Sequence, residues 1–170
     1  MVVDKELVIF DLDQTLVDTS QVEILRKNRQ WNKIGMSLSQ TIVYPGIKDT
    51  LDYLKSRGIK IAVFTSSPKS YAQDVLQHHN LPYDLLLGYH DVKMRKPSPE
   101  GFYKILKHFN IDSKKAISFG DQHTDILASN QAQIQSVACL WGNDDNDKLL
   151  DSKPSLIVAK SIDIYLAKGC

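Results

Sequence analysis

The chain alternates short runs of apolar residues with longer stretches in which apolar positions recur every three or four residues. Continuous apolar runs of about four to eight residues are typical of strands that are buried on both faces of a sheet. We therefore predict strands at Leu7–Phe10, Ile59–Phe64, Asp84–Gly88, Ala116–Phe119, Gln135–Leu140 and Ser155–Ala159.

The stretches between these runs predict helices. Gly46–Arg57 carries apolar residues at helical spacing and is followed by Gly58, a common C-terminal stop. Pro68–His79 and Pro97–Phe109 each begin with a proline, which the first turn of a helix tolerates. Alternating strands and helices indicate an α/β fold, a Rossmann-like three-layer sandwich with a mainly parallel sheet and helices on both faces.

One segment, at about residues 17–44, interrupts this alternation because it contains no strand-like run. Within it, Asp18–Trp31 is predicted to be helical, with Val22 and Leu25 on one side. We expect a minimal helical insertion, a cap, over the edge of the sheet. With 170 residues, the chain has the usual size of one domain, so we expect a single domain over residues 1–170.

Composition and charge exclude several classes of protein. Apolar residues make up 42% and charged residues 24%, and 21 basic residues oppose 20 acidic ones. This balance gives no sign of a nucleic-acid partner or of a membrane surface. Two cysteines make no disulfide framework, and the first apolar run is too short for a signal sequence or a membrane span. We expect a cytoplasmic protein; its oligomeric state stays open.

Polar residues follow four of the predicted strands in chain order. In sheets of this kind, ligands bind outside the carboxyl ends of the strands, so these residues are expected to share one site. They are Asp11 and Asp13 after the first run, Thr65 and Ser66 after the second, Lys96 beyond the third, and Asp121 and Asp125 after the fourth.

Four carboxylates at one edge of a sheet would repel one another unless a cation lay between them. Mg²⁺ prefers oxygen ligands and is often shared between carboxylates and phosphate, and no histidine or cysteine set competes for a softer metal. Each feature alone has an ordinary explanation, such as a turn for Asp-x-Asp, a helix cap for Thr65-Ser66-Ser67-Pro68 or a surface charge for Lys96. Their occurrence together and in order favours a site.

These pieces resemble the four motifs of the haloacid dehalogenase superfamily, over nearly the whole chain. The matching segments are Phe10–Leu16, Phe64-Thr65-Ser66, Lys96-Pro97-Ser98-Pro99 and Gly120–Asp125, and Tyr44-Pro45-Gly46 is similar to the phosphoglycolate-phosphatase-like branch. Gln14 departs from the pattern, because that branch usually has glycine there, and glycine permits backbone shapes that glutamine resists.

The resemblance implies a phosphatase that acts on a phosphate monoester. Asp11 would be the nucleophile that forms an aspartyl-phosphate, and Asp13 the general acid and base. Thr65 and Lys96 would hold the transferring oxygens.

The resemblance also implies the binding groups. The backbone amides of Leu12 and Ser66 would donate to phosphate. Mg²⁺ would be bound by Asp11, the backbone carbonyl of Asp13, and Asp121, with Asp125 supporting these ligands.

Two alternatives remain at this point. A phosphonate hydrolase of the superfamily needs a cap lysine, and Lys27 and Lys33 lie in the insertion, although lysines on a helix are usually solvated. A signalling or non-catalytic phosphate-binding module, such as a receiver-like domain, would accept phosphate on an acid after the third strand. Only Asp91 lies near that position.

A short cap predicts an open site, so we expect either a bulky phosphorylated substrate or closure by another subunit. The insertion carries a basic stretch that could meet an anionic substrate, although such stretches are usually solvated; it comprises Arg26, Lys27, Arg29 and Lys33. His123, within the fourth motif, could contact the leaving group.

Overall fold

The computed structural model describes residues 4–142 and 146–166. Its main sheet has the strand order β5-β4-β1-β6-β7-β8, and all neighbouring strands are parallel. The strands are β1 (Leu7–Phe10), β4 (Lys60–Phe64), β5 (Leu85–Leu87), β6 (Ala116–Gly120), β7 (Gln135–Cys139) and β8 (Leu156–Val158). Every predicted strand is present, and each end agrees with the prediction to within one residue.

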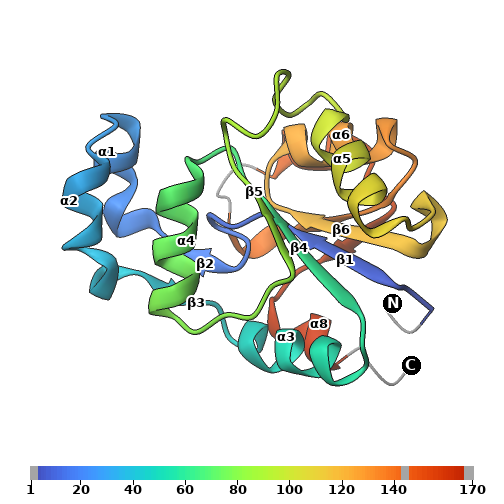
Figure 1. Cartoon of the computed structure of the whole chain (residues 1–170), viewed down its shortest axis with the longest axis horizontal. Helices are drawn as coiled ribbons and strands as arrows, with labels where there is room; N and C mark the ends of the chain where they lie inside the picture. Colours follow the sequence, from blue (N-terminus) through green and yellow to red (C-terminus); the bar gives the residue numbers. More distant parts are fainter. Residues whose placement is uncertain (1–3, 143–145, 167–170) are drawn as a thin grey trace.

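Helices cover both faces of this sheet (Figure 1). They are α3 (Ile47–Ser56), α4 (Lys69–His78), α5 (Glu100–Phe109), α6 (His123–Gln131), α7 (Asp147–Asp151) and α8 (Ile162–Leu166), with short 3₁₀ turns η3 (Ser113–Lys115) and η4 (Leu140–Gly142).

Strand β1 shows how the layers form. Val8 and Phe10 belong to the core beneath α3 and α4, whereas Leu7 and Ile9 belong to the core beneath α5 and α6. Alternate side chains of a strand point to opposite faces, so a fully apolar strand requires a layer on each side. The predicted three-layer α/β sandwich is confirmed.

One helix begins later than predicted. The chain from Pro97 was expected to be helical, but α5 begins at Glu100 with Pro99 as its N-cap. Ser98 precedes a proline, and a residue in that position disfavours helical geometry. Its hydroxyl instead accepts a bond from the amide of Glu100 at 3.3 Å. Because the helix begins only at Glu100, Lys96 lies on a loop before it, and this loop brings the lysine to the edge of the sheet beside Asp11.

The segment of residues 17–44 differs from its prediction in two respects. It consists of β2 (Val17–Asp18), η1 (Ser20–Val22), α1 (Glu23–Lys27), α2 (Trp31–Gly35), η2 (Leu38–Gln40) and β3 (Ile42–Val43). The single helix Asp18–Trp31 was wrong, because Arg29 has a left-handed φ of 54° that separates α1 from α2. The absence of strands was also wrong, because β2 and β3 pair antiparallel where the chain leaves and re-enters the domain.

This segment packs against α4 at one end of the molecule (Figure 1). Ile34 is buried, the rings of Trp31 and Tyr71 lie 5.5 Å apart, and Thr41 Oγ1 lies 2.7 Å from His79 Nε2. The segment is therefore fixed to the helix that follows β4.

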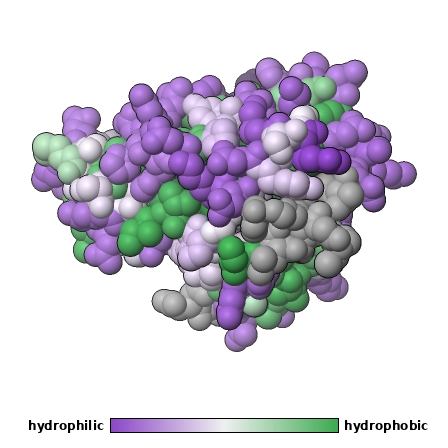
Figure 2. Space-filling model, turned by 90° about the horizontal axis from the view of Figure 1, so that it is seen from below, coloured by the Kyte–Doolittle hydropathy of each residue, from purple (hydrophilic) through white to green (hydrophobic). Residues whose placement is uncertain are grey.

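Seen from below, the surface is largely hydrophilic, with apolar side chains in separate patches (Figure 2). Scattered exposed apolar residues of this kind are normal for a folded domain. Among the described residues, no helix combines the length and the hydropathy needed to cross a bilayer.

Candidate active site

The candidate site is at the carboxyl ends of the three central strands. Asp11, Thr65 and Asp121 directly follow β1, β4 and β6. The register pairs Phe10 with both Val63 and Phe119, so these strands end at nearly the same level. The strand-end rule used on the sequence thus identifies residues that are neighbours in space.

Lys96 connects two of the acidic residues. Its side chain is only 3% exposed, and Nζ lies 2.8 Å from Asp11 Oδ1 and 2.7 Å from Asp125 Oδ1. A third bond of 2.6 Å is donated to the backbone carbonyl of Phe64. Burial alone would lower the pKa of Lys96, but Asp11 and Asp125 outweigh burial and raise it. The amine is therefore a fixed positive charge beside Asp11.

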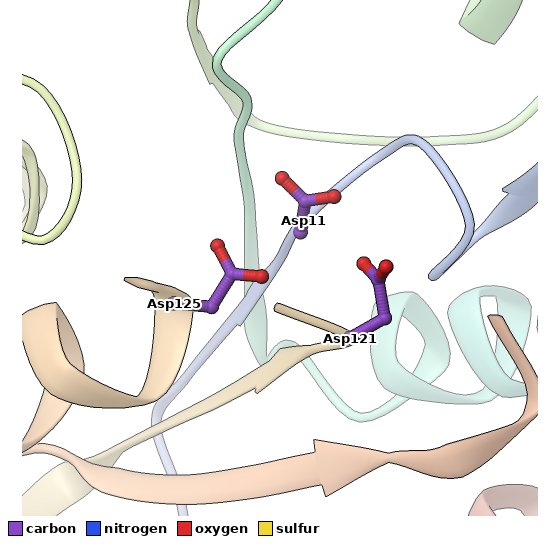
Figure 3. Close-up of side chains that lie close together, drawn as sticks. All are labelled: Asp11, Asp121 and Asp125. Atoms are coloured by element: carbon purple, nitrogen blue, oxygen red, sulfur yellow. The ribbon is translucent and has the colours of Figure 1, made fainter. Parts of the chain in front are cut away.

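Three carboxylates lie close together at this site: Asp11, Asp121 and Asp125 each offer an oxygen within 4.8 Å of the others (Figure 3). Burial raises the pKa of Asp11 well above its usual range. Lys96 opposes that shift, and the other two carboxylates add to it. Burial and the charge of Asp125 likewise raise the pKa of Asp121 to about 7. One ammonium thus leaves this carboxylate cluster short of positive charge.

The cluster fits a hard divalent cation. Its three side chains offer oxygen donors, and burial together with neighbouring carboxylates raises the pKa of Asp11 and of Asp121, so a cation there would relieve the cost of their negative charge. These are the donors that Mg²⁺ prefers. Asp125, which was expected only to support the ligands, is one of the three clustered carboxylates. The role of the Asp13 backbone carbonyl stays a prediction.

Gly120 lets Asp125 reach the cluster. A β-carbon at Gly120 would lie 2.6 Å from Asp125 Cγ, closer than real atoms approach. Asp125 is also held by the start of α6, where its Oδ2 accepts a bond of 3.0 Å from the amide of Gln122. Glycine is therefore required at position 120, because any side chain there would collide with that of Asp125.

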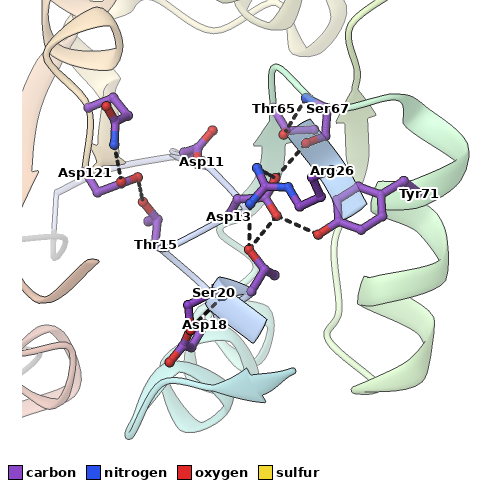
Figure 4. Close-up of polar contacts among 12 residues, drawn as sticks. Asp11, Asp13, Thr15, Asp18, Ser20, Arg26, Thr65, Ser67, Tyr71 and Asp121 are labelled. Atoms are coloured by element: carbon purple, nitrogen blue, oxygen red, sulfur yellow. Dashed lines mark hydrogen bonds and ion pairs between the residues drawn. The ribbon is translucent and has the colours of Figure 1, made fainter. Parts of the chain in front are cut away.

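Two neutral donors orient Asp121 (Figure 4). Thr15 Oγ1 donates to Asp121 Oδ1 at 3.0 Å, and Gln122 Nε2 donates to Oδ2 at 2.8 Å. Thr15 comes from the loop after β1, so this loop orients the acid that follows β6 and also carries Asp11 and Asp13.

Asp13 takes a different set of partners from Asp11. Its carboxylate is 6% exposed and is surrounded by four donors (Figure 4). These donors are Thr19 Oγ1 at 2.9 Å and Tyr71 OH at 2.7 Å on Oδ1, and Ser67 Oγ at 2.7 Å and Arg26 Nη2 at 2.9 Å on Oδ2. The two acids of the Asp-x-Asp pair thus have separate environments, one at the carboxylate cluster and one facing the 17–44 segment.

Sequence reasoning missed these four partners of Asp13. Ser67 was within reach of the strand-end rule, since it lies two residues after Thr65. Tyr71 reads as an ordinary core position of α4, and burial does raise its pKa, with Asp13 adding to the effect, so its hydroxyl remains a donor. No signal in the sequence marks Thr19 or Arg26 as partners of Asp13.

The basic stretch of the 17–44 segment does not form a single surface. Arg26 is drawn inward to Asp13, and its side chain is 21% exposed. Lys27, Arg29 and Lys33 are exposed, and Lys27 forms an ion pair of 2.8 Å with Glu23. A contact between this stretch and substrate stays a prediction.

The remaining predicted residues lie around the same edge. Thr65 is buried, and its hydroxyl accepts a bond of 3.0 Å from the amide of Ser67, which leaves the hydroxyl proton available for another acceptor. Leu12 is buried and Ser66 is exposed, so the former packs in the core and the latter faces outward. His123 begins α6 and is partly buried; its contact with a leaving group stays a prediction.

Gln14 adopts the backbone shape that glycine allows, with a φ of 64°. Its side-chain Oε1 accepts a bond of 2.8 Å from the hydroxyl of Tyr44. The turn is thus retained with glutamine, and the amide ties the loop after β1 to the end of the 17–44 segment.

The chain is similar to known proteins over most of its length. Residues 21–139 match the family model described as haloacid dehalogenase-like hydrolase. The phosphoglycolate phosphatase of Pasteurella multocida is 32% identical over 119 residues, which cover 69% of this chain and 53% of that protein. The phosphoglycolate phosphatase of Pseudomonas fluorescens is 25% identical over 126 residues, covering 73% and 46%.

Solved structures show the same fold. A predicted phosphoglycolate phosphatase from Haemophilus somnus superposes with a TM-score of 0.82 at 23% identity, covering 96% of this chain and 97% of that chain. A hydrolase from Pseudomonas syringae gives a TM-score of 0.79 at 22% identity, covering 96% and 98%.

The chain belongs to the haloacid dehalogenase-like hydrolase family. Within it, the curated relatives and the Tyr44-Pro45-Gly46 motif place it in the phosphoglycolate-phosphatase-like branch. The chain spans about half the length of the curated relatives it matches.

Proposed function

We propose that the protein is a Mg²⁺-dependent phosphatase that hydrolyses a phosphate monoester through an aspartyl-phosphate on Asp11. One observation carries the proposal: the buried ammonium of Lys96 bonds both Asp11 and Asp125 within a group of three carboxylates at the strand ends. Residues 17–44 would be the cap of a single domain.

In the first step, a carboxylate oxygen of Asp11 attacks phosphorus, and the bond from phosphorus to the ester oxygen breaks. Asp13 gives a proton to that oxygen, so the alcohol leaves neutral. Asp13 has four donors around it in the structure, so it must exchange one of them for the ester oxygen. In the second step, Asp13 takes a proton from water, the water oxygen attacks phosphorus, and Asp11 is released.

Fixed donors would stabilise the charge that spreads over the phosphoryl oxygens. Lys96 is held beside the nucleophile and stays protonated, because its pKa is raised by Asp11 and Asp125 despite burial. The Thr65 hydroxyl and the backbone amides of Leu12 and Ser66 lie at the ends of β1 and β4 and would complete this set.

Asp11, Asp121 and Asp125 surround the position where Mg²⁺ would bind, with the Asp13 carbonyl as a further ligand. The ion would supply positive charge that screens Asp11 from the dianionic phosphate as they approach. Thr15 and Gln122 would keep Asp121 oriented for it.

The structure supports this reading over the two alternatives. A phosphonate hydrolase would need a cap lysine that forms a Schiff base, and such a lysine must have a desolvated amine. Lys27 and Lys33 are instead exposed, and Lys27 is paired with Glu23. A receiver-like domain would use an acid after β5, but Asp91 instead caps the turn there, accepting a bond of 2.8 Å from the amide of Gly88.

A phosphate-release screen over sugar phosphates, nucleotides, phosphopeptides and p-nitrophenyl phosphate, with and without Mg²⁺, tests the proposal. We expect release that requires Mg²⁺ and is abolished by Asp11→Asn. Failure of every substrate with Mg²⁺ present, or full activity of the Asp11→Asn variant, would overturn it.

A further inference from the structure

A cleft of about 440 Å³ lies between the 17–44 segment and the core of the domain. The segment contributes Arg26, Trp31 and neighbouring residues of α1, and the core contributes Ser66, Ser67 and Tyr89. Clefts of roughly 300–1,000 Å³ accommodate drug-sized ligands. This one is therefore much larger than a two-carbon phosphate ester requires.

The cleft borders the leaving-group side of the proposed reaction. Arg26 and Ser67 both line it, and both bond Oδ2 of Asp13, the residue proposed to protonate the leaving oxygen. Asp121 and its partner Thr15 lie on the other side of Asp11 from these residues (Figure 4). A group attached to the leaving oxygen would thus extend from Asp13 into the cleft.

The charges in the cleft do not favour a polyanion. Arg26 is paired with Asp13, and Lys27 is paired with Glu23, a residue that also lines the cleft. Among the lining residues, this leaves Arg29 as a cation with no ion pair within the described chain. A second phosphate group would therefore find little net positive charge.

Aromatic rings come from both sides of the cleft. Trp31 belongs to α2 and is steadied by the ring of Tyr71 at 5.5 Å. Tyr89 follows β5 and is steadied by the guanidinium of Arg95, which lies 3.5 Å from the centre of its ring. Both rings are partly exposed, and rings that are held in place in this way offer stacking surface to a flat ligand.

We propose that this cleft selects phosphate monoesters whose leaving group carries an aromatic ring, held by Trp31 and Tyr89. The inference rests on the proposed phosphatase function and specifies its substrate class. It predicts that an aromatic ring in the leaving group raises kcat/KM more than an alicyclic group of the same size does.

Three synthetic substrates separate these effects: benzyl phosphate, cyclohexylmethyl phosphate of matched size, and ethyl phosphate. With Mg²⁺, we expect kcat/KM for benzyl phosphate to exceed that for cyclohexylmethyl phosphate by about 3- to 10-fold, the effect of one aromatic contact. In Trp31→Leu, this ratio should fall towards one, through a higher KM for benzyl phosphate. Tyr89→Leu, on the core side of the cleft, repeats the test in case Trp31→Leu fails to fold.

Met36→Ala is the matched control, because Met36 lies on the same segment, is 83% exposed and is outside the cleft. It should retain the wild-type ratio. Equal kcat/KM for benzyl and cyclohexylmethyl phosphate would overturn the inference and leave the phosphatase proposal standing. No Mg²⁺-dependent turnover of any of the three would also overturn the inference, whereas the phosphatase proposal is overturned only if every substrate of the screen described above fails as well.

Discussion

The guanidinium of Arg26 lies 2.9 Å from the carboxylate of Asp13, so the 17–44 segment is tied directly to the loop that carries the proposed nucleophile. Arg26 also donates a bond of 2.8 Å to Thr19 Oγ1, which itself donates to Asp13. The position of the 17–44 segment and the orientation of the proposed general acid and base are therefore coupled.

Arg26→Ala should lower kcat by about 10- to 100-fold, because Asp13 loses the donor that orients it. The free energy of unfolding should fall by about 1–3 kcal/mol, since Asp13 stays buried with its neutral donors. Steady-state kinetics and urea unfolding measure the two effects. Lys33→Ala, an exposed cation of the same segment, is the control and should change neither. An unchanged kcat in Arg26→Ala would show that the pair does not position Asp13.

Lys96→Met should destabilise the metal-free protein by about 3–5 kcal/mol, because it leaves buried carboxylates without their cation. Added Mg²⁺ should restore part of this loss. The matched control is Lys104→Met, since Lys104 is 46% exposed in its pair with Glu100 and should cost only about 0–1 kcal/mol. Urea unfolding with and without Mg²⁺ distinguishes the two; similar losses in both variants would contradict the picture of a buried cluster.

The stability of the metal-free protein should depend on the titration of Asp121. Its pKa is raised to about 7, whereas an unfolded aspartate titrates near pH 4. Between these values the folded state holds a proton that the unfolded state has lost, so this group makes stability fall as pH rises from about 4 to 7.

Mg²⁺ would replace that proton, so its stabilising effect should grow over the same pH range. Thermal unfolding of the protein and of Asp121→Asn, measured across pH 4–7 with and without Mg²⁺, tests this. The variant should lose this contribution to the pH dependence. A Mg²⁺ effect that is independent of pH would argue against binding at these carboxylates.

Gly120→Ala should displace Asp125, because the added methyl group would meet the Asp125 side chain. We expect activity to fall by at least about 10-fold and Mg²⁺ to bind more weakly, while the secondary structure is largely retained. Calorimetric titration of Mg²⁺ and circular dichroism measure these. Gly35→Ala, at a position with open space around it, is the control. Wild-type Mg²⁺ affinity in Gly120→Ala would be inconsistent with a role for Asp125 at the ion.

Much of the fold could be predicted from the sequence because β1, β4, β6 and β7 are buried on both faces and so appear as runs that are mainly apolar. Placing Asp11, Thr65 and Asp121 at one edge then followed from parallel strand ends alone. Lys96 lies on a loop some way beyond the third predicted strand, so its position in the chain only suggested this edge, and the resemblance to a family supplied its role.

The 17–44 segment was harder to predict, because its structure depends on local exceptions and distant contacts. The positive φ of Arg29 divides the expected helix, and the pairing of Val17 with Val43 creates strands of only two residues. The inward position of Arg26 depends on Asp13, which lies thirteen residues earlier on another element. Residue spacing on a helix does not encode such a contact.

In the proposed mechanism, the phosphoryl group passes through Asp11. During turnover of p-nitrophenyl phosphate with Mg²⁺, rapid quenching followed by borohydride reduction would convert an aspartyl-phosphate to homoserine, which peptide mass spectrometry locates. We expect homoserine at Asp11 and at no other aspartate, and none without substrate. Homoserine at Asp13 or Asp121 instead, or phosphate release with Asp11 unmodified under conditions that trap the intermediate, would contradict it.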